Sequence, residues 1–234
     1  MKNKIALVSG ASKGIGYALS ALLLDKGLKV ALCARHIQTL VDLFKEKGVD
    51  SSRYYVKSVD VKNEAEILAF VDEVASKFGH IDYLFNNVGM NTEKGEIFNI
   101  TTAAFDDMCA VNLRAPMIFT REVARLMIAQ KTKGTIVNTQ TTCDLFSNPG
   151  VGSYTATKAG FDALSKVFRK ELRDYEIKVM NVYPGGTDTA FRANKREDYL
   201  RPENVAEAII KQLSLAEELY LDDIVLRPWV ERNF

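Results

Sequence analysis

Short apolar runs alternate with longer amphipathic stretches along nearly the whole chain, and this alternation limits the possible folds more than any other feature. Runs rich in apolar and β-branched residues predict seven strands, at 5–9, 30–34, 54–58, 83–86, 135–138, 178–183 and 224–226. Helical spacing predicts helices at about 14–26, 37–47, 63–78, 102–130, 153–175 and 203–213. Strands that are apolar on both faces and are separated by helices form parallel sheets. The chain is therefore expected to fold as one α/β domain over residues 1–234, a doubly wound parallel sheet of about seven strands with helices on both faces.

Neither the charge balance nor the hydropathy indicates a nucleic acid or a membrane as a partner. Lys plus Arg number 31 and Asp plus Glu number 30, so the formal net charge is +1, whereas proteins that neutralise nucleic-acid phosphates are basic. The longest purely apolar runs have four or five residues, and a membrane-spanning helix needs about 20. Only four apolar residues follow the basic start at 1–4, too few for a signal peptide. We expect a cytoplasmic protein.

No metal site is expected from the cysteines and histidines. Cys33, Cys109 and Cys143 are far apart, His36 and His80 are isolated, and none of them has the spacing of metal ligands. An odd number of distant cysteines also agrees with a reducing compartment.

A glycine-rich turn leads from the first predicted strand into the first helix. Gly10, Gly14 and Gly16 have the spacing G-x-x-x-G-x-G, which differs from the G-x-G-x-x-G of the common dinucleotide-binding fingerprint. Glycines allow a tight turn and a close approach of the backbone to a diphosphate, and the helix N-terminus supplies free N–H groups. The candidate cofactor-binding residues of this turn are Gly10, Ser12, Lys13, Gly14, Ile15 and Gly16. A tight turn without a ligand is the alternative.

The end of the second predicted strand indicates which dinucleotide is bound. An acidic residue there would accept a hydrogen bond from the adenosine ribose and indicate NAD, but Ala34 occupies the position and Arg35 follows. A guanidinium pairs well with a phosphate, so Arg35 suits the 2′-phosphate of NADP, and Lys13 can reach the same region. We therefore expect NADPH (NADP+) as the cofactor. The alternative is that both residues are solvated surface cations.

Further candidate cofactor contacts follow the third and fourth predicted strands, where a cofactor lying across the strand ends would pass. Asp60 and Val61 follow the third strand, and Asn87 and Gly89 follow the fourth. A helix-capping aspartate and an asparagine-rich turn are the alternatives.

Tyr154 and Lys158 are four residues apart in a predicted helix, so their side chains project from one face. A free tyrosine has a pKa of about 10 and is a poor acid or base near neutrality. A neighbouring lysine ammonium favours the phenolate and lowers that pKa. A tyrosine and a lysine at this spacing often occur by coincidence, so the interpretation depends on the neighbouring motifs.

Five motifs resemble, in order and spacing, those of the short-chain dehydrogenase/reductase family, and the resemblance covers nearly the whole chain. The family's T-G-x-x-x-G-x-G corresponds to Ser9-Gly10 and Gly14-Ile15-Gly16, and its N-N-A-G corresponds to Asn86-Asn87-Val88-Gly89. Its helix asparagine corresponds to Asn112, and its Y-x-x-x-K corresponds to Tyr154 and Lys158. Its P-G-x-x-x-T corresponds to 184–189, which contains Pro184, Gly185, Thr187 and Thr189.

The resemblance implies a Rossmann-type fold and transfer of the pro-S hydride between a nicotinamide and a carbonyl or alcohol. It implies that Tyr154 is the acid/base, that Lys158 binds the nicotinamide ribose, and that Asn112 organises a proton relay. The other cofactor contacts that it implies are Pro184, Gly185, Thr187 and Thr189.

One departure from the family falls at the active site. The family usually has a serine thirteen residues before the tyrosine, and here that position is Thr141. Thr141 keeps a hydroxyl that can donate to a carbonyl oxygen, but its methyl group stiffens the side chain and narrows the pocket. Thr139 and Thr142 are adjacent hydroxyls that could serve instead. Ser9 and Val88 are milder departures.

Pro116 supports a relay at Asn112 independently of the family. It lies four residues after Asn112 and has no N–H, so the Asn112 carbonyl lacks its usual helical donor. A water between that carbonyl and the Lys158 ammonium would complete a path for protons to Tyr154. A simple helix kink is the alternative.

These observations together predict an NADPH-dependent oxidoreductase that reduces a carbonyl group, with Asn112, Thr141, Tyr154 and Lys158 as catalytic residues. The expected substrate is a small carbonyl compound or an acyl thioester. The alternative is an NADP-binding regulatory protein with impaired catalysis, which only Thr141 favours. We also expect a polar lid at 190–201 and a homodimer through the helices at about 102–130 and 153–175, with a homotetramer as the second choice.

Overall fold

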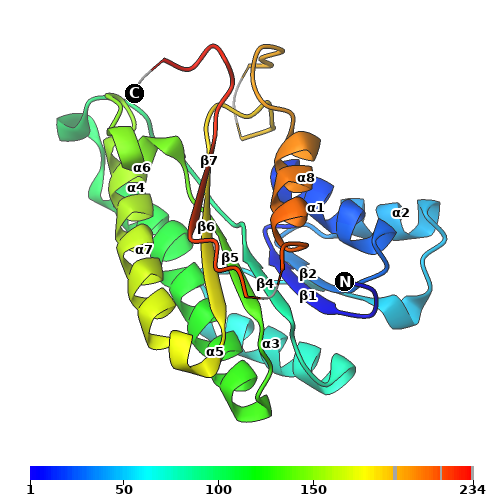
Figure 1. The fold of residues 1–234 in the computed structure, drawn as a ribbon. Helices are drawn as coiled ribbons and strands as arrows, with labels where there is room; N and C mark the ends of the chain where they lie inside the picture. Colours follow the sequence, from blue (N-terminus) through cyan, green and yellow to red (C-terminus); the bar gives the residue numbers. More distant parts are fainter. Residues whose placement is uncertain (192–193, 217, 233–234) are drawn as a thin grey trace.

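All seven predicted strands are present and form one parallel sheet in the order β3-β2-β1-β4-β5-β6-β7 (Figure 1). The computed structural model describes residues 1–191, 194–216 and 218–232. The strands are β1 (Ile5–Ser9), β2 (Lys29–Ala34), β3 (Tyr54–Ser58), β4 (Tyr83–Asn86), β5 (Thr135–Thr139), β6 (Lys178–Pro184) and β7 (Asp223–Leu226). The order of connection reverses between β1 and β4, which is the arrangement of a doubly wound sheet. The predicted fold class is confirmed.

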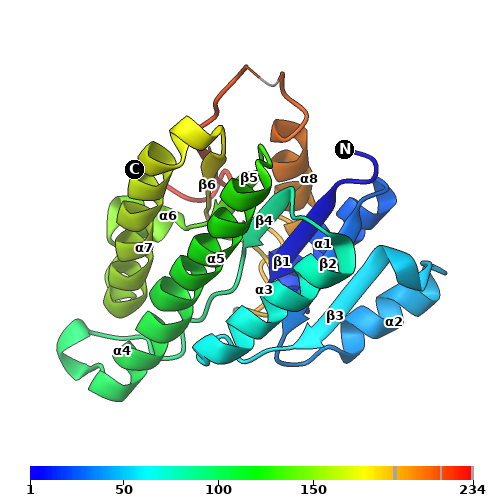
Figure 2. The same cartoon turned by 90° about the horizontal axis from the view of Figure 1, so that it is seen from below.

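Helices cover both faces of this sheet (Figures 1 and 2). On one face lie α1 (Gly14–Asp25), α2 (Gln38–Glu46) and α8 (Pro202–Gln212), and on the other lie α3 (Glu64–Phe78), α5 (Ala115–Gln130) and α7 (Gly152–Glu171). Alternate residues of a strand point to opposite faces, so Leu7 packs into the core on the α3 side while Ala6 and Val8 pack on the α1 side. This burial on two sides explains why the strands lack polar alternation.

The longest predicted helix, 102–130, consists of three consecutive segments. α4 (Thr102–Cys109) continues through a π-helical turn at Ala110–Arg114 into α5, and the Ala115 N–H donates to the Ala110 carbonyl. This wide turn comes just before Pro116, which cannot donate a helical hydrogen bond. The predicted helix 153–175 likewise ends early, at Glu171, and a 3₁₀ turn at Arg173–Tyr175 follows it.

Short elements that the periodicity did not predict connect the longer ones. α6 (Thr142–Phe146) follows β5, and the Thr141 Oγ1 caps it by accepting a hydrogen bond from the Cys143 N–H at 3.2 Å. Two further 3₁₀ turns lie at Ser51–Arg53 and Ile97–Asn99. No helix in the described ranges is long and apolar enough to cross a membrane.

A row of buried asparagine side chains crosses the middle of the sheet. Asn86, Asn138 and Asn181 are paired in register on β4, β5 and β6. The Asn86 Nδ2 donates to the Asn138 Oδ1 at 2.9 Å, and the Asn138 Nδ2 donates to the Asn181 Oδ1 at 3.2 Å. Thr120 of α5 and Ser165 of α7 complete the network from the helices above. Because an offset of one residue would bury these amides without partners, the row fixes the register of the three strands.

We expect Asn138→Ala to lower the free energy of unfolding by about 2–4 kcal/mol, because it opens a small cavity and leaves donors on Asn86 and acceptors around Ser165 unpaired. Urea unfolding followed by circular dichroism measures the change. Asn99→Ala, at an exposed 3₁₀ turn, is the matched control and should cost little. Equal losses in the two variants would contradict a structural role for the row.

Candidate active site

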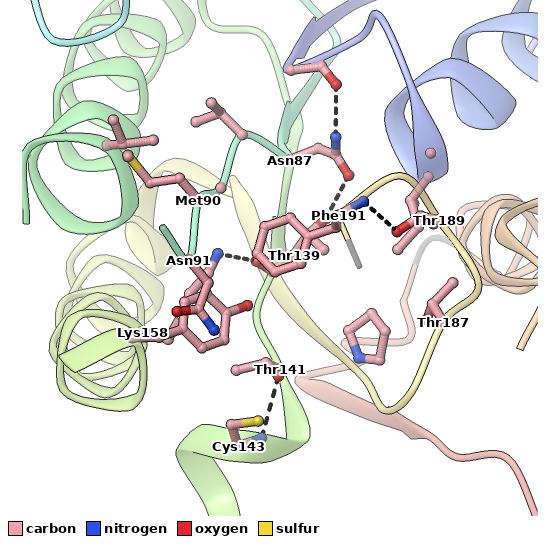
Figure 3. Close-up of a pocket in the computed structure, with 18 of the residues that line it drawn as sticks. Asn87, Met90, Asn91, Thr139, Thr141, Cys143, Lys158, Thr187, Thr189 and Phe191 are labelled. Atoms are coloured by element: carbon pink, nitrogen blue, oxygen red, sulfur yellow. Dashed lines mark hydrogen bonds between the residues drawn. The ribbon is translucent and has the colours of Figure 1, made fainter. Parts of the chain in front are cut away.

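A cavity of about 720 Å³ lies at the carboxyl ends of the strands, and Figure 3 shows the side chains that surround it. Residues that directly follow the first six strands contribute to its wall, as expected for a ligand site in a doubly wound sheet. All the predicted site residues line the cavity except Gly16 and Asn112, which lie behind it. In the described part of the chain, no three His, Cys, Asp or Glu side chains are grouped as metal ligands.

The glycine-rich turn has no room for side chains at two of its positions. Gly10 has a φ of +66°, and a Cβ added there would come within 2.8 Å of the Val88 Cα. A Cβ on Gly16 would overlap the Gly10 carbonyl and the Asn87 amide. Gly16 thus lets the start of α1 pack closely against the turn without itself facing the cavity. Lys13, at the N-cap position, makes no side-chain cap, which leaves the first N–H groups of α1 for a ligand.

Asn87 connects the glycine-rich turn to the end of β5 (Figure 3). Its Nδ2 donates to the Gly10 carbonyl at 3.1 Å, and its Oδ1 accepts from the Thr139 Oγ1 at 3.4 Å. Its backbone N–H donates to the Ser9 Oγ at 3.2 Å. The ends of β1, β4 and β5 are therefore held together by one side chain.

Two cations stand at the far rim of the cavity, beyond the ends of β1 and β2. Arg35 and Lys13 are exposed, line the cavity and form no ion pair among the residues that the structure describes. Ala34 precedes Arg35 in the wall, so no carboxylate occupies that strand end. Asp60 and Val61 line the same region, where the Asp60 Oδ1 accepts from the Lys62 N–H at 3.0 Å. Asp60 therefore forms a local turn, and the helix cap that was its alternative interpretation is supplied by Asn63, whose side chain accepts from the Ala65 N–H.

Lys158 is the only buried ammonium in the cavity wall within the described ranges. It is 3% exposed, and its Nζ donates to the Thr139 carbonyl at 2.8 Å. Burial lowers the pKa of Lys158 to about 8, although the neighbouring Asp144 carboxylate opposes this change. Burial, with repulsion from Asp162, raises the pKa of Asp144 to about 7. Tyr154 is half-buried one turn before Lys158, with its ring centroid 5.9 Å from that of Phe191.

The hydrogen bonds distinguish the three neighbouring threonines. The Thr139 hydroxyl donates to Asn87, and the Thr142 hydroxyl donates to the Glu231 Oε1 at 2.6 Å. The Thr141 hydroxyl accepts from the Cys143 N–H and donates to no other group in the described ranges. Of the three, Thr141 is the one whose hydroxyl proton is available to a ligand in the cavity.

Asn112 lies in the π-helical turn and is fully buried. Its Nδ2 donates to the Met90 carbonyl at 2.8 Å and to the Thr157 Oγ1 at 3.1 Å, and its Oδ1 accepts from the Met90 N–H at 2.8 Å. A Cβ added to Gly89 would lie 3.7 Å from the Asn112 Oδ1 and 3.8 Å from the Lys158 Nζ. The side chain thus fixes the loop after β4 against α7, close to Lys158.

Several residues that line the cavity were not among the predicted site residues. These are Gln140, Cys143, Asn148, Phe191, Tyr199 and Glu231. Phe191 and Tyr199 belong to the segment predicted as a lid; residues 192–193 of that segment lie outside the described residues. Glu231 comes from the C-terminal tail, and no local signal marks it, since its position depends on contacts with residues far away in the sequence.

Comparisons with known proteins agree with this geometry. The model of the short chain dehydrogenase family matches residues 4–200. Dehydrogenase/reductase SDR family member 11 of Bos taurus is 32% identical over 248 residues, covering 97% of this chain and 96% of that protein. An alcohol dehydrogenase from the archaeon Thermococcus sibiricus, complexed with 5-hydroxy-NADP, superposes with a TM-score of 0.89 at 26% identity, covering 99% of each chain. A metagenomic short-chain oxidoreductase in complex with NADP gives 0.85 at 27% identity, covering 98% of this chain and 99% of that one.

We expect Lys158→Met to stabilise the fold most at low pH. Because the pKa of Lys158 falls from 10.5 to about 8 on folding, the unfolded chain binds more protons between these values, and the stability of the wild type rises with pH across that window. The difference in the free energy of unfolding by which the methionine variant exceeds the wild type should therefore shrink by about 3 kcal/mol between pH 7.5 and 10.5. Urea unfolding of both proteins at several pH values measures it. Lys170→Met, exposed on the same helix, is the control, and an advantage independent of pH would contradict the buried charge.

Proposed function

Because the chain belongs to the short-chain dehydrogenase family, whose members are oxidoreductases that use NAD(P), we propose that it reduces a carbonyl substrate with NADPH. The observation that carries the proposal is the convergence, in one cavity, of the glycine-rich turn, the buried Lys158, Tyr154 and the available hydroxyl of Thr141. The direct experiment follows the loss of NADPH absorbance with a panel of ketones, diketones and acyl thioesters.

The residues that line the cavity fit a phosphorylated dinucleotide such as NADPH. The turn excludes side chains at Gly10 and Gly16, so its backbone can approach a diphosphate closely, and the uncapped start of α1 offers donors to it. Arg35 and Lys13 suit the 2′-phosphate of NADPH, because both are exposed cations without an ion pair in the described ranges. Pro184, Gly185, Thr187 and Thr189 also line the cavity and would contact the nicotinamide half.

When bound, NADPH supplies the hydride that reduces the carbonyl carbon. The Thr141 hydroxyl donates a hydrogen bond to the carbonyl oxygen and stabilises the negative charge that develops there. Tyr154 gives the proton that completes the alcohol, and the Lys158 ammonium, held by the Thr139 carbonyl, favours the phenolate that remains. Lys158 also binds the nicotinamide ribose. The Asn112 carbonyl, in the π-helical turn before Pro116, would hold a water that returns a proton from solvent.

A regulatory protein that binds NADP without catalysis is the second candidate, favoured by a threonine where the family usually has serine. The available hydroxyl donor of Thr141 argues against a regulatory protein, and the panel of substrates distinguishes the two candidates.

The proposed partners are the carbonyl substrate, a small molecule or acyl thioester, and a second copy of the chain. Exposed apolar side chains on α4 and α7, among them Phe105, Leu164 and Val167, support a homodimer through these helices.

Arg35→Asp should reverse the cofactor preference from NADPH to NADH. Losing a charge-assisted contact costs roughly 1.5–3 kcal/mol, so the affinity for NADPH should fall by about ten- to a hundredfold, while NADH gains an acceptor for its ribose. Fluorescence titration with both cofactors measures the ratio. Lys170→Asp is a charge-matched control at an exposed position outside the cavity. A wild type that binds NADH as well as NADPH would show that the assignment to NADP is wrong.

Tyr154→Phe should reduce the turnover rate by about 10²- to 10⁴-fold, because the ring remains and the acidic proton is lost. Thr141→Ala should cost roughly 10²-fold or more, whereas Thr141→Ser should keep or raise the rate. NADPH affinity should change little in all three variants. A normal rate in Thr141→Ala would show that another group donates the hydrogen bond to the carbonyl oxygen. A normal rate in Tyr154→Phe would show that Tyr154 does not supply the proton.

A further inference from the structure

The C-terminal tail returns to the active site after the last strand. It leaves β7 and runs across the end of the sheet where α6 lies (Figure 1). The Arg227 guanidinium lies 4.2 Å from the centre of the Phe146 ring of α6, and the Glu231 N–H donates to the Pro228 carbonyl at 3.1 Å. These contacts hold the tail so that the Glu231 carboxylate forms part of the cavity wall.

Two segments, which follow the neighbouring strands β5 and β6, hold the Glu231 carboxylate. Its Oε1 accepts from the Thr142 hydroxyl at 2.6 Å, and its Oε2 accepts from the Gly186 N–H at 2.9 Å. A Cβ on Gly185 would overlap the Oε2, so the carboxylate can occupy this place only because glycine stands there. Each oxygen still has a lone pair for a further donor.

Among residues 1–191, 194–216 and 218–232, no Lys or Arg forms an ion pair with Glu231. Five cations line the cavity within the described ranges. Arg35 and Lys13 stand at the rim beyond β1 and β2, and Lys94 is exposed in the loop after β4. The Lys62 Nζ pairs with Asp107, and the Lys158 Nζ is directed to the Thr139 carbonyl. The Thr142 hydroxyl that holds Glu231 belongs to the residue next to Thr141, so the negative charge lies close to the place where the proposed carbonyl oxygen would be held.

We propose that Glu231 determines substrate specificity: its carboxylate excludes carbonyl compounds that carry an anionic group near the reacting carbon and favours those that carry a hydrogen-bond donor there. Two negative charges that face the same cavity repel each other, whereas an amide or hydroxyl donor can bond to the free lone pairs of Glu231. The inference rests on the proposed reduction of a carbonyl, and it narrows the substrate to neutral or cationic compounds.

The test compares acetoacetamide with acetoacetate, which have nearly the same shape and differ in charge. The wild type should reduce the amide with a kcat/KM at least about tenfold higher than that of the acid. Glu231→Gln should raise kcat/KM for acetoacetate about tenfold or more and remove most of the preference. Glutamine can keep both anchors, because its oxygen can accept from the Gly186 N–H and its amide can donate to the Thr142 oxygen. Glu171→Gln, exposed at the end of α7, changes the net charge equally and should leave the preference unaltered.

Binding of unreactive analogues separates this inference from the proposed function. Calorimetry with butyramide and butyrate, in the presence of NADPH, should show at least about tenfold tighter binding of the amide to the wild type and nearly equal binding to Glu231→Gln. Equal binding of the two analogues to the wild type, or a variant that changes the amide and the acid alike, would overturn the role of Glu231. A wild type that discriminates between the analogues but reduces no carbonyl would instead refute the proposed reduction.

Discussion

The hydrogen-bonded row of Asn86, Asn138 and Asn181 is the interaction on which the site depends. It fixes the register of β4, β5 and β6, and each strand carries site residues just beyond its asparagine. Asn87 directly follows the first, and Thr139 and Thr141 follow the second. A parallel sheet gathers its carboxyl ends at one edge, so a fixed register becomes a fixed separation between these side chains. The cavity is in this sense a consequence of strand pairing deep in the core.

The buried ammonium of Lys158 lowers the stability of the folded chain. A lysine at this degree of burial disfavours its own charge, and its pKa is lowered to about 8. The Thr139 carbonyl supplies one strong hydrogen bond, and Asp144 supplies an attraction that keeps the ammonium charged near neutrality. The same side chain thus weakens the folded state and places a buried cation in the cavity wall, one helical turn after Tyr154.

The sequence allowed the sheet to be predicted nearly to the residue, because strands buried on both faces have a composition that surface segments cannot share. Residues just beyond the strands could be assigned to the cavity for the same topological reason. The π-helical turn and α6 escaped prediction, since one is a local widening of a helix and the other spans little more than one turn. Glu231 escaped because its place depends on Gly185, Gly186 and Thr142, contacts formed only once the tail has folded back. The choice among Thr139, Thr141 and Thr142 likewise required the hydrogen bonds of the folded chain.

We propose that this cavity brings a nicotinamide and a carbonyl together for direct hydride transfer. To test this, the protein is incubated with 2,3-butanedione or acetoacetamide and with NADPH that is deuterated at the pro-S position of its nicotinamide ring. The alcohol products are then analysed by mass spectrometry. Direct transfer should give an alcohol that carries one deuterium on the carbon that was the carbonyl carbon. If NADPH binds tightly but neither alcohol carries deuterium, the proposed direct hydride transfer is wrong.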